Sequence, residues 1–225
     1  MQNNIQALNI HFTNIIDGRP IVLHDSNYVN PFGESYSISK LRYYISNIEL
    51  HSATGASYIR SSYLVDEAKE ASHVIRLRIK KSNYQTISFL FGVDSVHNVS
   101  GAQSGALDPM NDMFWTWNTG YVMAKFEGTS TASLLHNQVF EYHIGGFRGP
   151  NHVLHKVTLV LPENGKLKQV SSSKDIYIKA DVNKWWYGST DIKIASNPSV
   201  TTPGVLAKEI SNNYSRMFSI DNSRD

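Results

Sequence analysis

The stretch LRYYISNIELHSATGASYIRSSYLV, residues 41–65, contains two runs rich in aromatic and β-branched residues, and Thr54-Gly55 separates them. Such side chains favour extended strands, whereas Thr-Gly steps are typical of turns. The stretch therefore predicts two strands, over residues 41–51 and 57–65, with a turn between them.

The same pattern recurs along most of the chain. Seven further runs of this composition are bounded by turn residues, and they cover residues 7–16, 74–79, 84–93, 114–126, 139–144, 152–161 and 176–182. Asn164-Gly165 is a strong signal for a tight hairpin. Nine short strands predict an all-β fold, a two-sheet antiparallel β-sandwich. No internal repeat or low-complexity linker is visible, so we expect a single domain over residues 1–225.

The period of the pattern changes near the end of the chain. In TTPGVLAKEISNNYSRMF, residues 201–218, apolar side chains recur at helical spacing. Thr202 can cap a helix there, and Pro203 is suited to the first helical position. We therefore predict a C-terminal helix over about residues 204–216 that lays one face on the sheets.

Composition excludes several classes of protein. The 225 residues are 41% hydrophobic and 18% charged, with a formal net charge of +2 and no basic run. We therefore expect no nucleic-acid partner. No apolar stretch is long enough for a transmembrane segment. The first residues carry no signal peptide, which predicts either a cytoplasmic product or a trimmed mature form. Cysteine is absent, so disulfides and thiolate metal sites are excluded.

An oxygen-rich loop interrupts the strand pattern over residues 91–113. Its carboxylates and amides belong to Asp94, Asn98, Asp108, Asn111 and Asp112. Calcium prefers oxygen ligands of this kind, although the spacing matches no EF-hand. The same residue types also form tight turns, so a calcium loop and a structural loop both remain open. In either case we expect the loop to be ordered and packed near the strand that follows it.

Aromatic and imidazole side chains stand out in two short segments. MFWTWNTGY, residues 113–121, places Trp115 and Trp117 on one face if the segment is extended. His143 lies in YHIGG, residues 142–146, where two glycines allow close backbone approach. No nucleophile motif, metalloprotease motif or cofactor fingerprint accompanies these segments, so we expect no enzymatic activity.

A run of blocks in order along the chain resembles a known family. The blocks are LRYYISNIEL, YLVD, FLFGVDSVHNVSGAQSGALDP, MFWTWNTGY, KFEG, HIGG, ADV and NYSRMF. They are similar to the MbnP-like family of methanobactin-associated copper-binding proteins. This resemblance implies a bacterial β-sandwich exported to the periplasm or the cell surface. It also implies copper held by two histidines and by a kynurenine, which a diheme peroxidase-type partner makes from tryptophan.

The resemblance assigns candidate ligands to this chain. Trp115 and Trp117 match the W-x-W block, and His143 matches the H-x-G block. For the second imidazole, His11 in the first strand and His97 in the oxygen-rich loop are the candidates. An intact indole offers no lone pair to a metal, whereas opening its five-membered ring frees an arylamine. Imidazoles suit copper, so the predicted function is copper binding or handling.

A binding module is the rival interpretation. Trp185, Trp186 and Tyr187 are consecutive, and exposed aromatics of this kind could form a platform for a glycan or for another surface protein. An oxidoreductase is a third reading, but no cofactor fingerprint supports it. The oligomeric state is left open.

Overall fold

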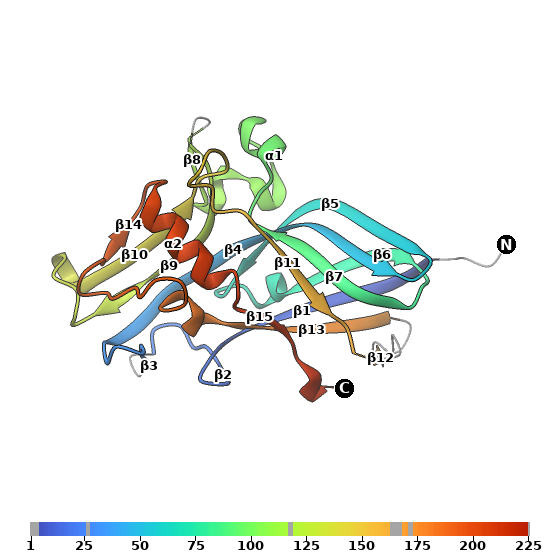
Figure 1. The fold of residues 1–225 in the computed structure, drawn as a ribbon, viewed down its shortest axis with the longest axis horizontal. Coiled ribbons are helices and arrows are strands. Elements are labelled where there is room, and N and C mark those ends of the chain that lie inside the picture. Colours follow the sequence, from blue (N-terminus) through green and yellow to red (C-terminus); the bar gives the residue numbers. More distant parts are fainter. Residues whose placement is uncertain (1–4, 26–27, 117–118, 163–167, 171–172, 225) are drawn as a thin grey trace.

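Two β-sheets form the framework of the computed structural model, which describes residues 5–25, 28–116, 119–162, 168–170 and 173–224 (Figure 1). The first sheet contains β1 (Ile5–Ile16), β2 (Arg19–Pro20), β6 (Val74–Lys80), β12 (Lys168–Val170), β13 (Ser173–Asp181) and β15 (Phe218–Ile220). The second contains β3 (Tyr28–Val29), β4 (Ser35–Ser52), β5 (Gly55–Asp66), β7 (Tyr84–Phe91), β8 (Phe114–Thr116), β9 (Gly120–Ser130), β10 (Val139–Gly145), β11 (His155–Val160) and β14 (Ser199–Val200).

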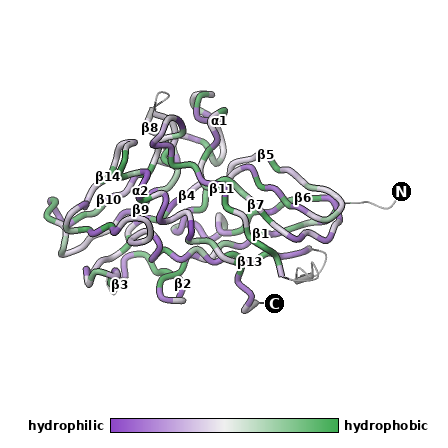
Figure 2. Tube along the Cα trace, viewed as in Figure 1, coloured by the Kyte–Doolittle hydropathy of each residue, from purple (hydrophilic) through white to green (hydrophobic). Residues whose placement is uncertain are grey.

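Alternation along the strands places the core between the two sheets. In β1, Leu8, Ile10 and Phe12 are buried, while the residues between them are partly exposed. Hydrophobic and hydrophilic residues alternate in this way along several strands (Figure 2). Because successive side chains of a strand point to opposite faces, one face of each sheet packs inward. The predicted all-β sandwich is confirmed.

Most strand pairs are antiparallel, as expected, but two pairs are parallel. The β1 and β13 strands run parallel, with Ile10 opposite Ile176. The short β14 pairs in parallel with the end of β10. A parallel pair joins strands that are distant in the sequence, and β1 and β13 bring the two ends of the chain into one sheet.

The segment from residue 114 to 126 is not the single strand that its composition predicts. β8 and β9 form an antiparallel pair, with Phe114 opposite Tyr121. Gly120 has φ 76°, a left-handed conformation that suits a turn. The prediction of one continuous strand is therefore wrong, because the chain reverses direction in its middle. The predicted hairpin turn at Asn164-Gly165 lies outside the described residues.

Helical segments are short, apart from α2 (Val205–Tyr214). Among the described residues, the others are α1 (Ser95–Val99) and the 3-10 turns η1 (Glu70–His73), η2 (Gly105–Leu107), η3 (Pro109–Asn111), η4 (His136–Gln138), η6 (Val182–Trp185) and η7 (Asn222–Arg224). The predicted C-terminal helix is confirmed, but its predicted cap is not. Gly204 is the N-cap residue and no side chain caps the helix, because the helix begins after Pro203 and beyond the reach of Thr202.

An aromatic cluster fills the interior at the end of the sandwich beneath α2. Trp185 packs edge-on against Phe126 and at a tilt against Tyr214, with ring centroids 5.2 Å and 4.6 Å away. Trp186 packs edge-on against Tyr36 and donates its indole N–H to the Tyr36 hydroxyl at 3.2 Å. Both indoles are fully buried. Among the described residues, every helix is too short or too polar to cross a membrane.

Candidate functional site

Trp115 packs against the end of β10. A Cβ atom built on Gly145 would overlap the six-membered ring of Trp115, so the indole lies directly over the glycine backbone. The carbonyl oxygen of Tyr121 lies on the same side of Gly145. Trp115 is only partly buried, in contrast to the indoles of the core. The Gly-Gly step in YHIGG predicts a close approach to the backbone, and Trp115 is the side chain that makes it.

His143 lies two residues before Gly145, on the same strand. Ile144, between them, is fully buried in the core, so His143 points away from the core, and the register of β10 against β9 shifts between Ile144 and Gly145. The His143 Nε2 atom lies 2.8 Å from Oε1 of Glu127 on the neighbouring strand β9. An ionised carboxylate can only accept, so this imidazole nitrogen donates and Nδ1 keeps the lone pair. The structure thus places His143 two residues along β10 from the glycine that Trp115 covers.

Two lysines and two carboxylates form a charged cluster with His143. Lys125 is 3% exposed, and its ammonium lies 2.9 Å from Oδ2 of Asp112. Lys40 lies 3.2 Å from Asp112 and 3.2 Å from Glu127. Burial raises the pKa of Glu127, but hydrogen bonds from His143 and Lys40 outweigh it and hold that pKa below its ordinary value. Asp112 keeps a lowered pKa for the same reason, through Lys125 and Lys40.

The strand register explains how these charges meet. His143 is directly opposite Lys125 in the antiparallel pair of β9 and β10, and Glu127 is two residues further along β9. Glu127 and Lys125 are functional candidates that the sequence does not single out. The alternation of KFEG, residues 125–128, places them on one face, but only the register with β10 shows which histidine they approach.

His97 lies in a different direction, on α1. Its Nδ1 atom is 2.9 Å from both carboxylate oxygens of Asp94, and Asp94 also caps α1 through the backbone N–H of His97. Burial raises the pKa of Asp94, but these bonds and one from Asn47 hold it below its ordinary value. The ring lines a pocket over β4 and β5, whereas Trp115 packs on β10. The structure does not place His97 beside Trp115.

His11 lies on the first sheet rather than the second. Its Nε2 atom is 2.7 Å from Oδ1 of Asp175, and its ring stacks on Tyr177 at 4.6 Å. Its β1 neighbours Ile10 and Phe12 point into the core, so His11 faces outward from the opposite layer. His11 is therefore not brought near Trp115. Trp117, the other predicted copper-site tryptophan, lies outside the described residues.

Protein groups already use the oxygen atoms of the predicted calcium loop. Asn98 is fully buried and joins the carbonyl of Val93 to the backbone N–H of Tyr121. Asp108 caps η3 through the N–H of Met110, and Asp94 and Asp112 form the ion pairs given above. These contacts confirm that the loop packs against the β8–β9 hairpin. Within the described residues, no three His, Cys, Asp or Glu side chains gather as a metal site would require.

The aromatic platform of the rival binding module is not present at Trp185 and Trp186. Both indoles have no exposed surface and pack inside the core. Tyr187 is partly buried, with Lys184 4.9 Å above its ring. Trp185 is the last residue of η6, which α2 contacts, and Trp186 packs against Tyr36, so neither indole can stack on a sugar.

The comparisons with known proteins agree with the fold. The MbnP family model matches residues 5–203. The solved structure of MbnP from Methylosinus trichosporium superposes with a TM-score of 0.59, covering 83% of this chain and 79% of that one. The two sequences are 12% identical, so this likeness shows a common fold alone. No curated protein sequence matches the chain.

Proposed function

The chain belongs to the MbnP family, and on that premise we propose that it binds copper on the outer face of β9 and β10. The observation that carries the proposal is the placement of Trp115 on Gly145, two residues from His143. In this proposal the protein is exported and acts outside the cytoplasm as a copper-binding protein rather than as an enzyme.

The donor set supports one imidazole ligand. Histidines that bind metals commonly donate their other N–H to a carboxylate, which fixes the ring and strengthens the ligand. His143 has this arrangement, because Glu127 lies 2.8 Å from its Nε2 atom. His143 would therefore hold the ion through Nδ1. His11 and His97 show the same pairing with Asp175 and Asp94, but at other places on the molecule.

Trp115 supplies the second nitrogen only after oxidation. With a diheme peroxidase-type partner, two molecules of hydrogen peroxide would cleave the C2–C3 bond of the indole, each giving one oxygen atom to one of the two carbons and leaving as water, so that N-formylkynurenine forms. Hydrolysis then removes the C2 carbon as formate and leaves kynurenine with a free arylamine. The partly buried position of Trp115 keeps the ring within reach of such a partner, whereas the core indoles have no exposed surface.

The experiment oxidises the protein with peroxide and a diheme peroxidase and then locates the product by peptide mass mapping. Fragment ions should place kynurenine at Trp115, with Trp185 and Trp186 unchanged. Copper(I) affinity, measured by competition with a chromophoric chelator, should rise by about 100-fold on oxidation, on the order of one added nitrogen ligand.

The Trp115→Phe variant separates this gain from other effects of peroxide. It keeps an aromatic ring over Gly145 and should show no gain in copper affinity after the same treatment. Kynurenine found at other tryptophans while Trp115 stays intact would contradict the proposal, as would an equal gain in Trp115→Phe.

A further inference from the structure

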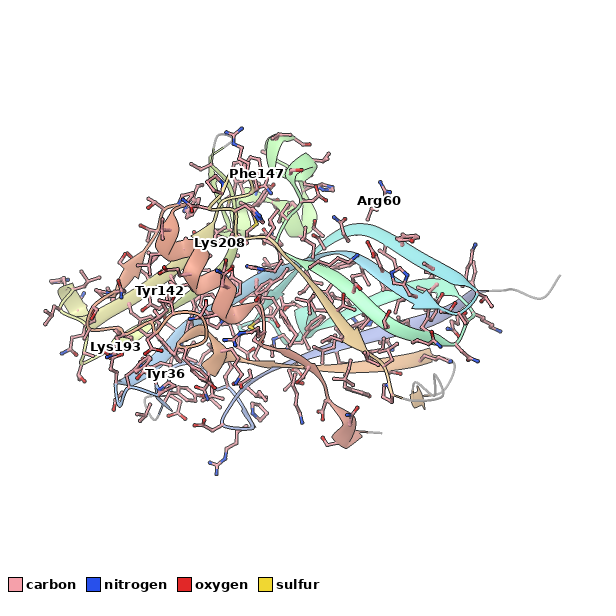
Figure 3. The ribbon with its side chains drawn as sticks, viewed as in Figure 1. Tyr36, Arg60, Tyr142, Phe147, Lys193 and Lys208 are labelled. Carbon is pink, nitrogen blue, oxygen red and sulfur yellow. The ribbon has the colours of Figure 1, made fainter. Side chains whose placement is uncertain are left out.

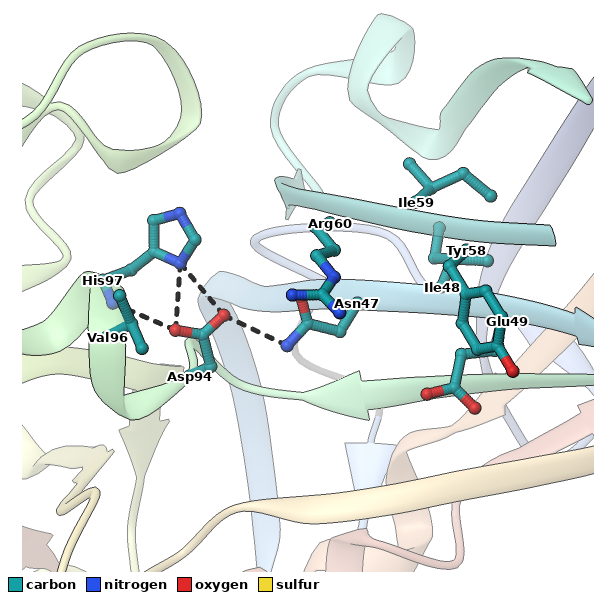
Figure 4. Close-up of a pocket in the computed structure, with 9 residues that line it drawn as sticks. All are labelled: Asn47, Ile48, Glu49, Tyr58, Ile59, Arg60, Asp94, Val96 and His97. Atoms are coloured by element: carbon teal, nitrogen blue, oxygen red, sulfur yellow. Dashed lines mark hydrogen bonds and ion pairs between the residues drawn. The ribbon is translucent and has the colours of Figure 1, made fainter.

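A hollow of about 530 Å³ lies over the β4–β5 ribbon, beside α1. Figure 4 shows His97 and Asp94 at one end, Tyr58 and Glu49 at the other, and Arg60 between them. Cavities of this size accommodate small organic molecules. Neither Trp115 nor His143 lines it, so it is separate from the proposed copper site.

A chain of hydrogen bonds fixes the histidine at one end of this pocket. Asn47 lies in a bulge where β4 has one more residue than the paired β7, with φ 49°, and its amide donates to Oδ2 of Asp94 at 3.0 Å. Asp94 in turn accepts from Nδ1 of His97. Because Nδ1 carries the proton, Nε2 of His97 has a free lone pair and accepts a hydrogen bond from a ligand. The bulge thus orients a polar group in the pocket.

Arg60 is the cation of the pocket that a ligand can reach. Asp94 accepts hydrogen bonds from His97 and Asn47, and Glu49 lies 2.6 Å from the ammonium of Lys156. Arg60 is exposed and forms no ion pair within the described chain. Figure 3 shows it projecting outward from β5. A guanidinium binds carboxylates with two parallel hydrogen bonds, so Arg60 is suited to an organic anion.

Apolar side chains make up the rest of the lining. Tyr58 and Val96 are 63% and 69% exposed, which is unusual for residues of their size and polarity. Ile48 on β4 and Ile59 on β5 also line the pocket. Apolar walls with a few convergent polar groups are typical of ligand sites.

We propose that this pocket binds a small amphipathic carboxylate. Its carboxylate pairs with Arg60, an N–H or O–H group donates to Nε2 of His97, and an aromatic or aliphatic body packs on Tyr58, Ile59 and Val96. An acylated amino acid or the apolar C-terminal residue of a peptide has this chemistry. An inorganic phosphate lacks the apolar body and should bind more weakly.

The test titrates metal-free protein with N-acetylphenylalanine and follows methyl NMR signals of the pocket. Shifts should concentrate on Val96, Ile59 and Ile48, with a dissociation constant on the order of 1 mM for a ligand of this size. N-acetylphenylalaninamide, which lacks the carboxylate, should bind about 10-fold more weakly. Inorganic phosphate at the same concentration should leave the apolar methyl signals unmoved.

Matched variants decide the roles of the two polar groups. Arg60→Gln should weaken binding about 10-fold, while Arg76→Gln, an exposed arginine on β6, should leave it unchanged. His97→Gln should weaken binding about 3-fold to 10-fold. Trp115→Phe should have no effect, so failure of the copper proposal would leave this one standing. Binding unaltered by Arg60→Gln, equal binding of the amide, or no shifts at 10-fold above the expected constant would overturn the proposal.

Discussion

Trp115 and Trp186 carry the same side chain but differ in burial and in the residues around them. Trp186 is fully buried among Tyr36, Phe126 and Phe140, with its N–H bonded to a tyrosine hydroxyl. Trp115 is partly buried, lies over the Gly145 backbone and packs against the core from its edge. An indole that is fully buried with its N–H bonded stabilises the fold, whereas a partly exposed indole can be reached by a second molecule. The two settings separate a structural role from a functional one.

Truncation of the two rings should have unequal costs. Trp186→Ala should destabilise the protein by about 3–5 kcal/mol, because it leaves a cavity in the aromatic cluster and an unpaired tyrosine hydroxyl. Trp115→Ala should cost only about 1–2 kcal/mol, since less apolar surface is lost. Urea unfolding measured by circular dichroism checks both values. Equal losses would mean that Trp115 is also a core residue, and the comparison would fail.

Gly145→Ala tests how Trp115 is seated. The added methyl group would overlap the indole, so the ring must move or the strand must shift, at a cost of about 1–3 kcal/mol. Gly204→Ala is the matched control, because no atom lies within 4 Å of the added carbon there. A crystal structure of Gly145→Ala with Trp115 unmoved and no loss of stability would show that the indole does not depend on this glycine.

The two regions should also respond to pH in different ranges. Near the core, burial, aided by the charges of Lys208 and His152, lowers the pKa of His155 from 6.5 to about 4. A lowered pKa means that the unfolded chain binds the proton first, so this stability is complete above pH 6.5 and is lost as the pH falls towards 4. Beside His143, the pKa of Glu127 is lowered, so the stability that its ionised carboxylate contributes is lost only as the pH falls below the ordinary glutamate pKa of 4.5.

Unfolding by urea at several pH values separates these contributions. Between pH 7.5 and 4.5 the free energy of unfolding of the wild type should fall by on the order of 2 kcal/mol. This is less than the lowered pKa of His155 alone would give, because the ring is only partly buried and solvent screens its charge. His155→Gln should remove most of the pH dependence of the unfolding free energy in this range, whereas the substitution of the exposed His136 by Gln should leave it unchanged. If His155→Gln keeps the full slope, another group is responsible.

The sequence predicts the strands well because their signal is local. Alternation in β1 and the aromatic run of β5 place these strands to within two residues at each end, whereas β4 begins at Ser35, six residues before its predicted start. The reversal between β8 and β9 escapes prediction, since continuous aromatic composition conceals a turn whose marker is Gly120. A local pattern therefore determines an element better than it determines where two elements join.

The candidate site depends on contacts between strands, which composition does not report. The Gly-Gly step after His143 does predict a close approach, and Trp115 is the side chain that uses it. Glu127 becomes a partner of His143 only through the register of β9 and β10. His97 is near the tryptophans in sequence, yet the Asn47 bulge and Asp94 hold it over β4 and β5. Proximity along the chain is therefore a poor guide to the second ligand.

Copper titration of the oxidised protein and of its His143→Ala variant is the most direct test of the proposed site. Oxidised wild type should bind copper(I) about 100-fold more tightly than oxidised His143→Ala, because the variant loses its imidazole ligand. The exposed His136→Ala variant, oxidised in the same way, should match the wild type. Equal affinities of oxidised wild type and His143→Ala would contradict a copper site at Trp115 and His143.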